Sequence, residues 1–211
     1  KKSATSIATA FVSADPVPLR KGSDGSLLTS TGDVDPTEAT QLLANAYAGT
    51  IDDSVLDTEN VYFSIVFDCG YPTDVKTQIV NLAQTRRDCV ALVDNGDTSS
   101  YSTSLSNRQN VHTFNTYYAA IYEEYNKVYD IFTGQYVWFS PIFHMSYLVP
   151  RNDQVAELWY AVAGFNRAAI DSIKELRFNP KLAQRDGMYL KQLNPIVKFN
   201  EGYTVWGNLT S

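Results

Sequence analysis

Two almost continuous apolar runs, residues 61–67 and 89–93, flank a stretch in which apolar residues recur at helical spacing. Runs without a polar side are typical of strands that other elements cover on both faces. Between them, residues 73–87 place Val75 and Ile79 on one stripe, which predicts a crossover helix. A strand, a helix and a parallel strand within about thirty residues form a βαβ unit. The pattern therefore predicts an α/β fold, a mixed sheet containing a βαβ unit with helices packed on it.

Start and stop signals predict two further helices. Asp35 can cap the first, a proline follows at its first position, and Gly49 ends it. Asn179 can cap the second, again followed by a proline, with helical periodicity over residues 181–193. Apolar residues of the segment 155–162 fit the face of another helix.

Shorter segments fill the rest of the chain. β-branched and aromatic residues predict a strand at 6–12, one or two strands across 114–128 and 135–139, and a last strand at 202–207. Residues 22–25 contain two glycines suited to a turn. Asp, Asn, Gly, Ser and Thr dominate residues 94–110, and because such residues bury little apolar surface, we expect an exposed loop there.

Composition narrows the class of protein. With 211 residues, 44 % of them hydrophobic, the chain can bury a core, and we expect a single domain over residues 1–211. There are 17 Lys and Arg against 23 Asp and Glu, a net charge of -6, and no basic run follows a phosphate backbone. Nucleic acid is therefore not an expected partner. A membrane is not expected either, since no segment approaches the roughly 20 apolar residues that cross a bilayer. Without an initiator Met before Lys1, we expect a piece of a longer protein.

The two cysteines, Cys69 and Cys89, are expected to be free thiols. The first falls just past one predicted strand and the second at the start of its parallel neighbour. Strands of about five residues would hold these positions ~17 Å apart, beyond the ~7 Å limit of a disulfide. Free thiols fit assembly in a reducing cytoplasm.

The strongest enzymatic hypothesis rests on Asp68 and Asp94, at the carboxyl ends of the two strands of the βαβ unit. Open α/β sheets bind ligands at that edge, and two carboxylates there could hold Mg²⁺ for phosphoryl transfer. Asp68-Cys69-Gly70 loosely resembles the nucleophile loop of haloacid-dehalogenase-like phosphatases, but Gly70 stands where that loop needs a second Asp, and no Lys is evidently placed to neutralise a phosphate. A small Mg²⁺-dependent hydrolase is therefore the alternative to a structural role, in which these carboxylates cap turns.

Other candidate chemistry is weaker. His112 and His144 form no zinc or triad pattern, and packing or surface positions explain them better. The segment 94–97, Asp-Asn-Gly-Asp, lacks the ligand spacing of a calcium loop and predicts a polar turn. The fourteen tyrosines suit packing and contact between subunits, with a glycan-binding surface as a third hypothesis. We expect no catalytic residue, no metal and no cofactor.

Several short motifs follow one another in a distinctive order. They are Gly-Ser-Asp-Gly at 22–25, Arg-Arg-Asp at 86–88, Tyr-Tyr-Ala-Ala-Ile-Tyr at 117–122, Val-Pro-Arg-Asn-Asp at 149–153, Ala-Gly-Phe-Asn-Arg at 163–167, Gln-Arg-Asp at 184–186, Leu-Asn-Pro-Ile at 193–196 and Gly-Tyr-Thr-Val-Trp-Gly-Asn-Leu-Thr at 202–210. In this order they resemble the core of contractile tail sheath proteins of myophages, which are related to pyocin and type VI secretion sheaths. Leu193 and Leu209 depart from the usual Ile or Val and the usual Arg of the family.

The resemblance implies a set of structural positions and no active site. The positions matching the family motifs are Gly22, Asp24, Gly25, Arg87, Asp88, Gly164, Asn166, Arg185, Asp186, Asn194, Gly202, Trp206 and Gly207.

The resemblance also implies a function and partners. Sheath subunits polymerise as hexameric rings around the tail tube, are joined by extended terminal arms, and contract to drive the tube through the host envelope. The expected location is the virion tail, assembled in the host cytoplasm, and the expected partners are other sheath subunits and the tube. The family has a C-terminal tube-facing domain after its Trp-Gly motif, whereas this chain stops at Ser211. Because the terminal arms that join the rings are missing, we expect this chain alone to be a monomer.

Overall fold

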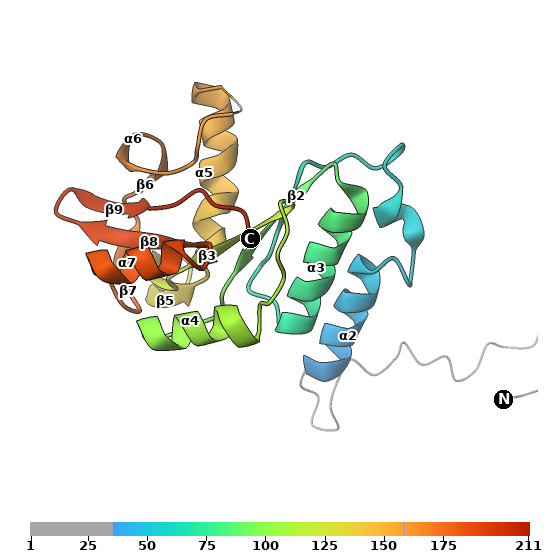
Figure 1. The fold of residues 1–211 in the computed structure, drawn as a ribbon, viewed down its shortest axis with the longest axis horizontal. Coiled ribbons are helices and arrows are strands. Elements are labelled where there is room, and N and C mark those ends of the chain that lie inside the picture. The colour runs from blue at the N-terminus through green and yellow to red at the C-terminus, as the bar shows by residue number, and fades with distance from the viewer. Residues whose placement is uncertain (1–35, 158) are drawn as a thin grey trace, which may run out of the picture. The chain divides into compact units, whose positions relative to one another are not determined.

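The computed structural model describes residues 36–157 and 159–211. The residues that follow Ala39 form one compact unit, Thr40–Ser211. The elements in chain order are α2 (Pro36–Tyr47), the 3-10 helix η1 (Asp53–Leu56), β1 (Ile65–Phe67), α3 (Thr73–Arg86), β2 (Val90–Asp94), α4 (Tyr101–Asn110), β3 (Ala119–Glu123), β4 (Asn126–Asp130), β5 (Gln135–Phe139), α5 (Ile142–Val155), α6 (Phe165–Ala168), β6 (Ala169–Ile170), β7 (Ile173–Leu176), α7 (Leu182–Tyr189), β8 (Leu193–Phe199) and β9 (Gly202–Val205) (Figure 1).

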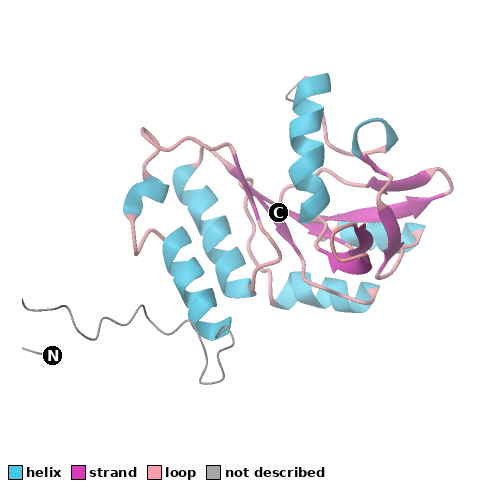
Figure 2. Ribbon diagram, turned by 180° about the vertical axis from the view of Figure 1, so that it is seen from behind, coloured by secondary structure: helices cyan, strands magenta, loops and turns pink. Residues whose placement is uncertain are grey.

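The main sheet has six strands in the order β1-β2-β3-β8-β9-β6. β1, β2, β3 and β8 run parallel, whereas β9 pairs antiparallel with both β8 and β6. A second sheet, β5-β4-β7, is antiparallel throughout. Parallel neighbours need crossover connections, and Figure 2 shows the helices that supply them. The predicted α/β class and its mixed sheet are confirmed.

The predicted βαβ unit is β1, α3 and β2. The strands pair in parallel with Phe67 opposite Leu92. Helix α3 ends at Arg86, and Arg87 caps it in the left-handed conformation with φ of 63°. β1 is shorter than predicted and only half-buried, because it lies at an edge of the sheet and so has a strand on one side only.

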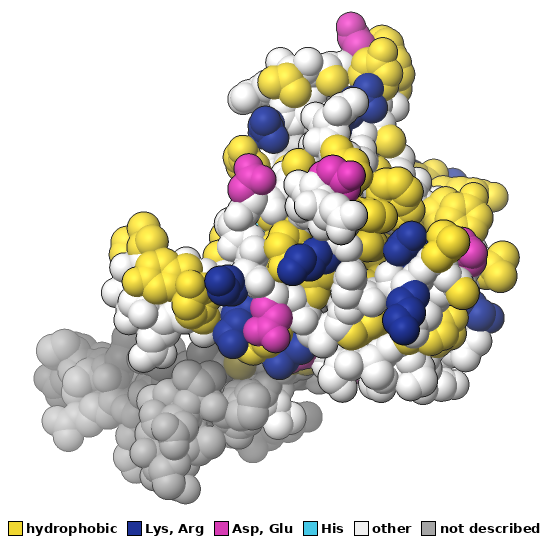
Figure 3. All heavy atoms as spheres, turned by 90° about the vertical axis from the view of Figure 1, so that its left-hand side faces the viewer, with side chains coloured by type: hydrophobic (Ala, Val, Ile, Leu, Met, Phe, Trp, Pro, Cys, Tyr) yellow, Lys and Arg dark blue, Asp and Glu magenta, His cyan; other side chains and the backbone are white. Residues whose placement is uncertain are grey.

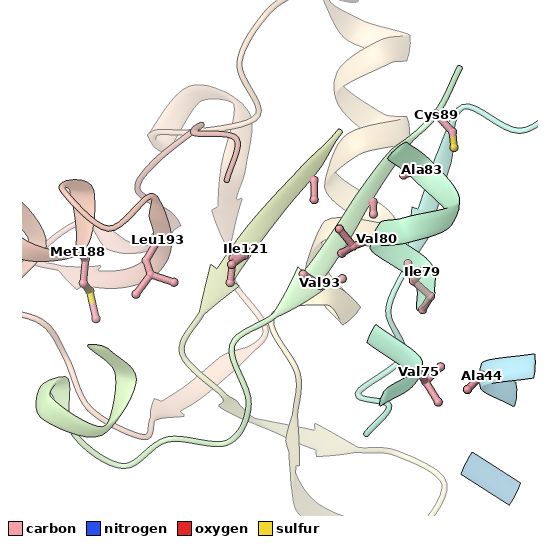
Figure 4. Close-up of a cluster of buried hydrophobic side chains, with 12 residues drawn as sticks. Ala44, Val75, Ile79, Val80, Ala83, Cys89, Val93, Ile121, Met188 and Leu193 are labelled. Atoms are coloured by element: carbon pink, nitrogen blue, oxygen red, sulfur yellow. The ribbon is translucent and has the colours of Figure 1, made fainter. Parts of the chain in front are cut away.

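Side chains on both faces of the main sheet are buried, as expected for parallel strands between helices. Along β2, Ala91 and Val93 belong to one hydrophobic cluster and Leu92 to the other. Figure 4 shows the first cluster, in which α3 contributes Ile79 and α7 contributes Met188. The second cluster lies against α5, whose buried residues there are Ile142, Met145 and Leu148.

The prediction of an exposed loop over residues 94–110 is wrong. Residues Tyr101–Asn110 form helix α4, which Ser100 caps by accepting a hydrogen bond from the Thr103 N–H at 3.3 Å. The helix is polar and buries only Ser104 and Arg108. It therefore lacks the apolar stripe by which such helices are found in a sequence.

The helix predicted over 155–162 is also misplaced. Helix α5 ends at Val155, at the point where that prediction began. The predicted helix 181–193 is shorter, because α7 spans Leu182–Tyr189 and Leu193 already opens β8. The apolar residues Leu182, Tyr189 and Leu190 of that segment are exposed, with Leu190 at 80 %, and Met188 is the residue of α7 that packs into the core.

The remaining predictions have mixed outcomes. The helix before Gly49 is confirmed as α2, and the last strand as β9. The segment 114–139 contains three strands, β3, β4 and β5, where one or two were predicted. The strand at 6–12, the turn at 22–25 and the cap Asp35 lie outside the described residues. None of the described helices combines the length and apolarity needed to span a membrane.

Candidate functional site

The carboxyl-end edge of β1 and β2 brings together the two aspartates that the sequence suggested. Asp68 directly follows β1, and Asp94 is the last residue of β2. Because the strands are parallel neighbours, both side chains emerge at one edge of the sheet. The Asp94 N–H donates to Asp68 Oδ2 at 3.3 Å, and the two residues are at most 1 % exposed.

A buried lysine lies between the two carboxylates, contrary to the expectation that none was suitably placed. Lys76 Nζ lies 2.5 Å from Asp94 Oδ1 and 3.3 Å from Asp68 Oδ2, and the residue is 4 % exposed. Lys76 is in α3, next to Val75 and one turn before Ile79, on the face that packs against the sheet. That position on an apolar helix face was the available sequence signal.

Further donors complete the hydrogen bonding of Asp94. The Gly96 N–H donates to Oδ1 at 2.7 Å, Ser140 Oγ donates to Oδ2 at 2.7 Å, and Tyr125 Oη donates to Oδ2 at 3.3 Å. With Lys76, these donors occupy the roughly four acceptor sites of a carboxylate. Asp94 therefore ties together β2, α3 and the segments around Tyr125 and Ser140.

Burial and charge separate the two aspartates in acidity. Burial, and next the Asp94 carboxylate, raise the pKa of Asp68 to about 6. Burial acts on Asp94 in the same direction, but the Lys76 ammonium and several hydrogen bonds outweigh it and hold the pKa of Asp94 below its usual value. The edge thus keeps Asp94 ionised against Lys76, while Asp68 takes up a proton in mildly acidic solution.

This arrangement resembles a closed structural ion pair more than a metal site. The cation that balances the carboxylates is already present as Lys76, and the oxygens of Asp94 are all engaged. Among the described residues there is no group of three or more His, Cys, Asp or Glu that could hold a metal ion. A hollow of about 300 Å³ adjoins Asp68, but phenylalanines such as Phe67 and Phe143 line much of it. The Mg²⁺-dependent hydrolase hypothesis gains no support.

The other residues considered for chemistry have structural surroundings. Both histidines are buried, and burial lowers the pKa of each to about 4, so both are neutral at pH 7. His144 Nε2 lies 2.7 Å from Asn126 Oδ1, and the ring of His112 packs near Phe114. Of the polar turn predicted over 94–97, Asp94 belongs to β2, and residues 95–97 form a polar connection with Gly96 at φ of 92°. Cys69 and Cys89 are both free thiols, as predicted.

Two buried glutamates at the end of β3 went unnoticed in the sequence. Glu123 accepts hydrogen bonds from Thr98 Oγ1 at 2.7 Å, Ser104 Oγ at 2.8 Å and the Asn95 amide. Glu124 is fully buried with φ of 85°, and among the described residues neither of its carboxyl oxygens has a hydrogen-bond partner of ordinary geometry, although the backbone of Phe178 lies nearby. Burial, and next the neighbouring Glu123, raise the pKa of Glu124 to about 10, which keeps it protonated at neutral pH. The sequence pattern of the strand did not predict that these carboxyls are buried, because strand periodicity does not indicate which polar groups bind one another.

The motif residues near the C-terminus hold the last segment against the sheet. Asn194 in β8 is fully buried, and its Nδ2 donates to the carbonyls of Ile121 at 3.0 Å and Leu209 at 2.8 Å. Its Oδ1 accepts the Leu209 N–H at 2.8 Å. A Cβ on Gly207 would lie 2.7 Å from Asn194 Oδ1, so only glycine allows this approach. Beyond them, the Ser211 N–H donates to the Ala119 carbonyl at 2.9 Å.

The other motif positions have structural surroundings as well. Asp88 forms a salt bridge with Arg86 at 2.8 Å, whose buried guanidinium also binds the carbonyls of Val55 and Val61, each at 2.7 Å. Gly164 has φ of 80°, and its N–H donates to the Val205 carbonyl.

Arg185 donates to the Pro180 carbonyl at 3.0 Å, and Gly202 begins β9 with φ of 140°. Trp206 packs on Phe199. Asn166 and Asp186 are exposed. Gly22, Asp24 and Gly25 lie outside the described residues.

These features define an α/β domain whose buried polar groups serve packing. No family model matches the chain. It is 32 % identical over 97 residues to the tail sheath protein of Vibrio phage KVP40, a match that covers 46 % of this chain and 14 % of that protein. It is 26 % identical over 155 residues to the tail sheath protein of Enterobacteria phage T4, covering 65 % of this chain and 23 % of that protein.

Solved structures show the same fold. The chain matches a component of the anti-feeding prophage baseplate with a TM-score of 0.54 and 18 % identity, covering 89 % of this chain and 53 % of the other. It matches the helical sheath of that particle in its contracted state with a TM-score of 0.58 and 16 % identity, covering 83 % and 45 %. The two sequence relatives are both tail sheath proteins, and the solved structures show a fold like that of this chain.

Proposed function

We propose that this chain is a structural part of a contractile tail sheath subunit. The observation behind the proposal is the likeness to two tail sheath proteins together with the fold of a contractile sheath. The closed Asp68–Lys76–Asp94 cluster favours the same conclusion, since its groups bind one another and tie elements together. The relatives are structural proteins, and we propose that this chain likewise has no enzymatic activity.

The function proposed for the whole subunit follows from the family. Such a subunit polymerises as hexameric rings around a tail tube and contracts, which drives the tube through the host envelope. We propose the virion tail as its location, assembled in the host cytoplasm, and other sheath subunits and the tube as its partners. Residues 1–211 would form one domain of the sheath wall, a rigid body that moves while its connections flex.

The complete gene product that contains this chain provides the test of this function. Expressed with and without its tail tube protein and viewed by negative-stain electron microscopy, it is expected to form rings or tubular sheaths. Particles that stay dispersed in both preparations would contradict the proposal. A phosphatase assay with Mg²⁺, run on the chain and on Asp68→Asn, is expected to show no turnover that depends on Asp68.

The isolated chain is proposed to be a monomer at micromolar concentration. It spans less than a quarter of the length of the curated relatives it matches, so most contacts of such a subunit would involve other parts. Sedimentation velocity is expected to give a single species at the monomer mass of 23.6 kDa. A ring or tube formed by the chain alone would contradict this expectation.

A further inference from the structure

Two surfaces of opposite charge lie towards opposite ends of the main sheet. β1 forms one edge of the six-stranded sheet, and β6, paired with β9, forms the other. In Figures 1 and 2, η1 and its flanking loops lie at the end beyond β1, and the β8–β9 hairpin lies at the opposite end. The charged residues of the chain are unevenly divided between these two ends.

The acidic surface consists of Ile51, Asp52, Asp53, Glu59 and Tyr62, all exposed. Its apolar members are far from covered, with Ile51 at 58 % and Tyr62 at 81 % exposure. No Lys or Arg occurs in the sequence between Lys21 and Lys76, and Lys76 itself is buried against Asp94. Arg86 reaches this segment, but its buried guanidinium binds Asp88 and backbone carbonyls. Among the described residues, the carboxylates of Asp52, Asp53 and Glu59 therefore form no salt bridge, and the surface keeps its negative charge.

An apolar hollow adjoins the acidic surface. It measures about 340 Å³ and is lined by Leu43, Tyr47, Ile51 and Val55, with Asp52 at its side. A hollow of this size, apolar inside with a carboxylate beside it, suits an aromatic side chain whose neighbours are cations.

The basic surface surrounds the β8–β9 hairpin and consists of Phe165, Arg185, Lys198, Phe199, Tyr203 and Trp206, with one exposed carboxylate, Glu201, in the hairpin turn. The Arg185 guanidinium lies 5.2 Å from the Phe199 ring centre, and Lys198 Nζ lies 5.5 Å from that of Tyr203. Phe199 packs between Phe165 and Trp206, at 5.4 Å and 5.0 Å between ring centres. Trp206 remains 45 % exposed. Figure 3, which views this end of the molecule, shows dark-blue Lys and Arg side chains lying among yellow hydrophobic ones, with magenta Asp and Glu side chains also on this face.

The segment that contains the β8–β9 hairpin has a net positive charge, whereas the whole chain is negative. Residues 160–206 contain seven Lys and Arg against four Asp and Glu, whereas the whole chain has a net charge of -6. Stacked aromatic rings and arginine are the residue types enriched at the centres of protein interfaces.

We propose that the basic surface of one copy of this chain docks on the acidic surface of a second copy. The inference rests on the proposed sheath function, and it assigns one contact between subunits to particular residues. The partner is a second copy because the same chain has both complementary surfaces, each combining charge with exposed apolar side chains. Since the two surfaces differ and lie at opposite ends, the contact is head-to-tail, and it propagates as a ring or helix instead of closing a dimer.

The contact is a weak one in the isolated chain. Exposed charges attract each other modestly and are screened by salt, so the pairing depends on subunits already held side by side. This is consistent with a monomer at micromolar concentration.

NMR spectra of the ¹⁵N-labelled chain, recorded from about 0.05 to about 2 mM, detect association of this strength. We expect the chemical shifts of residues in both surfaces to change with concentration. We expect no such change elsewhere in the chain. Glu59→Lys and Lys198→Glu each place like charges opposite one another and are expected to raise the dissociation constant about tenfold or more. An equimolar mixture of the two variants restores opposite charges and is expected to recover the wild-type shifts.

Matched controls are Asp153→Lys and Arg151→Glu on α5, which make the same charge changes at exposed sites outside both surfaces. They are expected to leave the dissociation constant unchanged, and the spectra themselves report whether each variant is folded. Shifts that are absent, that lie elsewhere, or that the mixture does not restore would overturn the inference. If the complete gene product forms sheaths but Lys198→Glu leaves their assembly unaffected, the docking inference fails while the proposed function stands.

Discussion

At the scale of single residues, Lys76 decides the charge balance of the sheet edge. It is the only cation within 4 Å of either Asp68 or Asp94 among the described residues, and all three are buried. Desolvating charges costs several kcal/mol per ion, and their mutual attraction offsets this only while the geometry is kept. The sequence could place the aspartates at one edge from strand order, but it could not show that a helix residue already neutralises them.

Lys76→Met should therefore destabilise the fold. Two buried carboxyls would lose their counter-charge, and we expect the free energy of unfolding at pH 7.5 to fall by about 3–5 kcal/mol. Because protonated carboxyls need no counter-charge, and because removing Lys76 raises the pKa of both, the loss should shrink as the pH falls from 7.5 towards about 6, the pKa of Asp68 when Lys76 is present. Urea denaturation at several pH values measures this. A loss that does not change with pH would contradict the assignment.

Glu124 gives the fold a second dependence on pH. Its pKa is raised from 4.5 to about 10, so the folded protein holds this proton more tightly than the unfolded chain does. The free energy of unfolding that it contributes is complete below about pH 4.5 and is lost as the pH rises towards 10.

Glu124→Gln removes that titration. Between pH 6 and pH 9 the stability of the variant should fall less steeply than that of the wild type, with a difference of order 1 kcal/mol per pH unit. Glu59→Gln, at an exposed site, is the control and should keep the wild-type slope. Equal slopes for wild type and Glu124→Gln would show that Glu124 is ionised in the folded protein.

At the scale of elements, hydrophobic periodicity located what is apolar and missed what is polar. The βαβ unit could be predicted because α3 presents a stripe, Val75 and Ile79, to strands that are themselves buried. Helix α4 was missed because its buried residues, Ser104 and Arg108, are polar. The boundary between α7 and β8 was misplaced because Leu193 fits either period, and only its pairing with Ile121 of β3 decides.

The motif resemblance singled out the C-terminal segment but did not show how it is held in the fold. The Asn194 side chain binds both the N–H and the carbonyl of Leu209, and Gly207 allows the backbone of the segment to lie close to Asn194. Gly207→Ala would set a methyl group against Asn194 Oδ1 and should lower the free energy of unfolding by about 1–3 kcal/mol. Thermal or urea unfolding measures it, with Asn208→Ala at an exposed neighbour as the control. An unchanged Gly207→Ala protein would mean that the segment is held elsewhere.

At the scale of the whole molecule, the sequence predicted the fold class and the family resemblance, and the structure supplied the reasons. The order of short motifs suggested tail sheath proteins, and the two sequence relatives are tail sheath proteins, although no single motif has a chemical signature. The two oppositely charged surfaces could not be predicted, since their residues, such as Glu59 and Lys198, are brought to opposite ends only by the strand order of the sheet.

We propose that this chain is a structural block in a sheath wall and that its buried charges serve packing. A cryo-EM reconstruction of particles assembled from the complete gene product tests it most directly. We expect tubes or rings in which this domain repeats in the wall and Asp68, Lys76 and Asp94 are enclosed as described. A reconstruction with the domain absent from the wall, or with those carboxylates open around a bound ion, would contradict it.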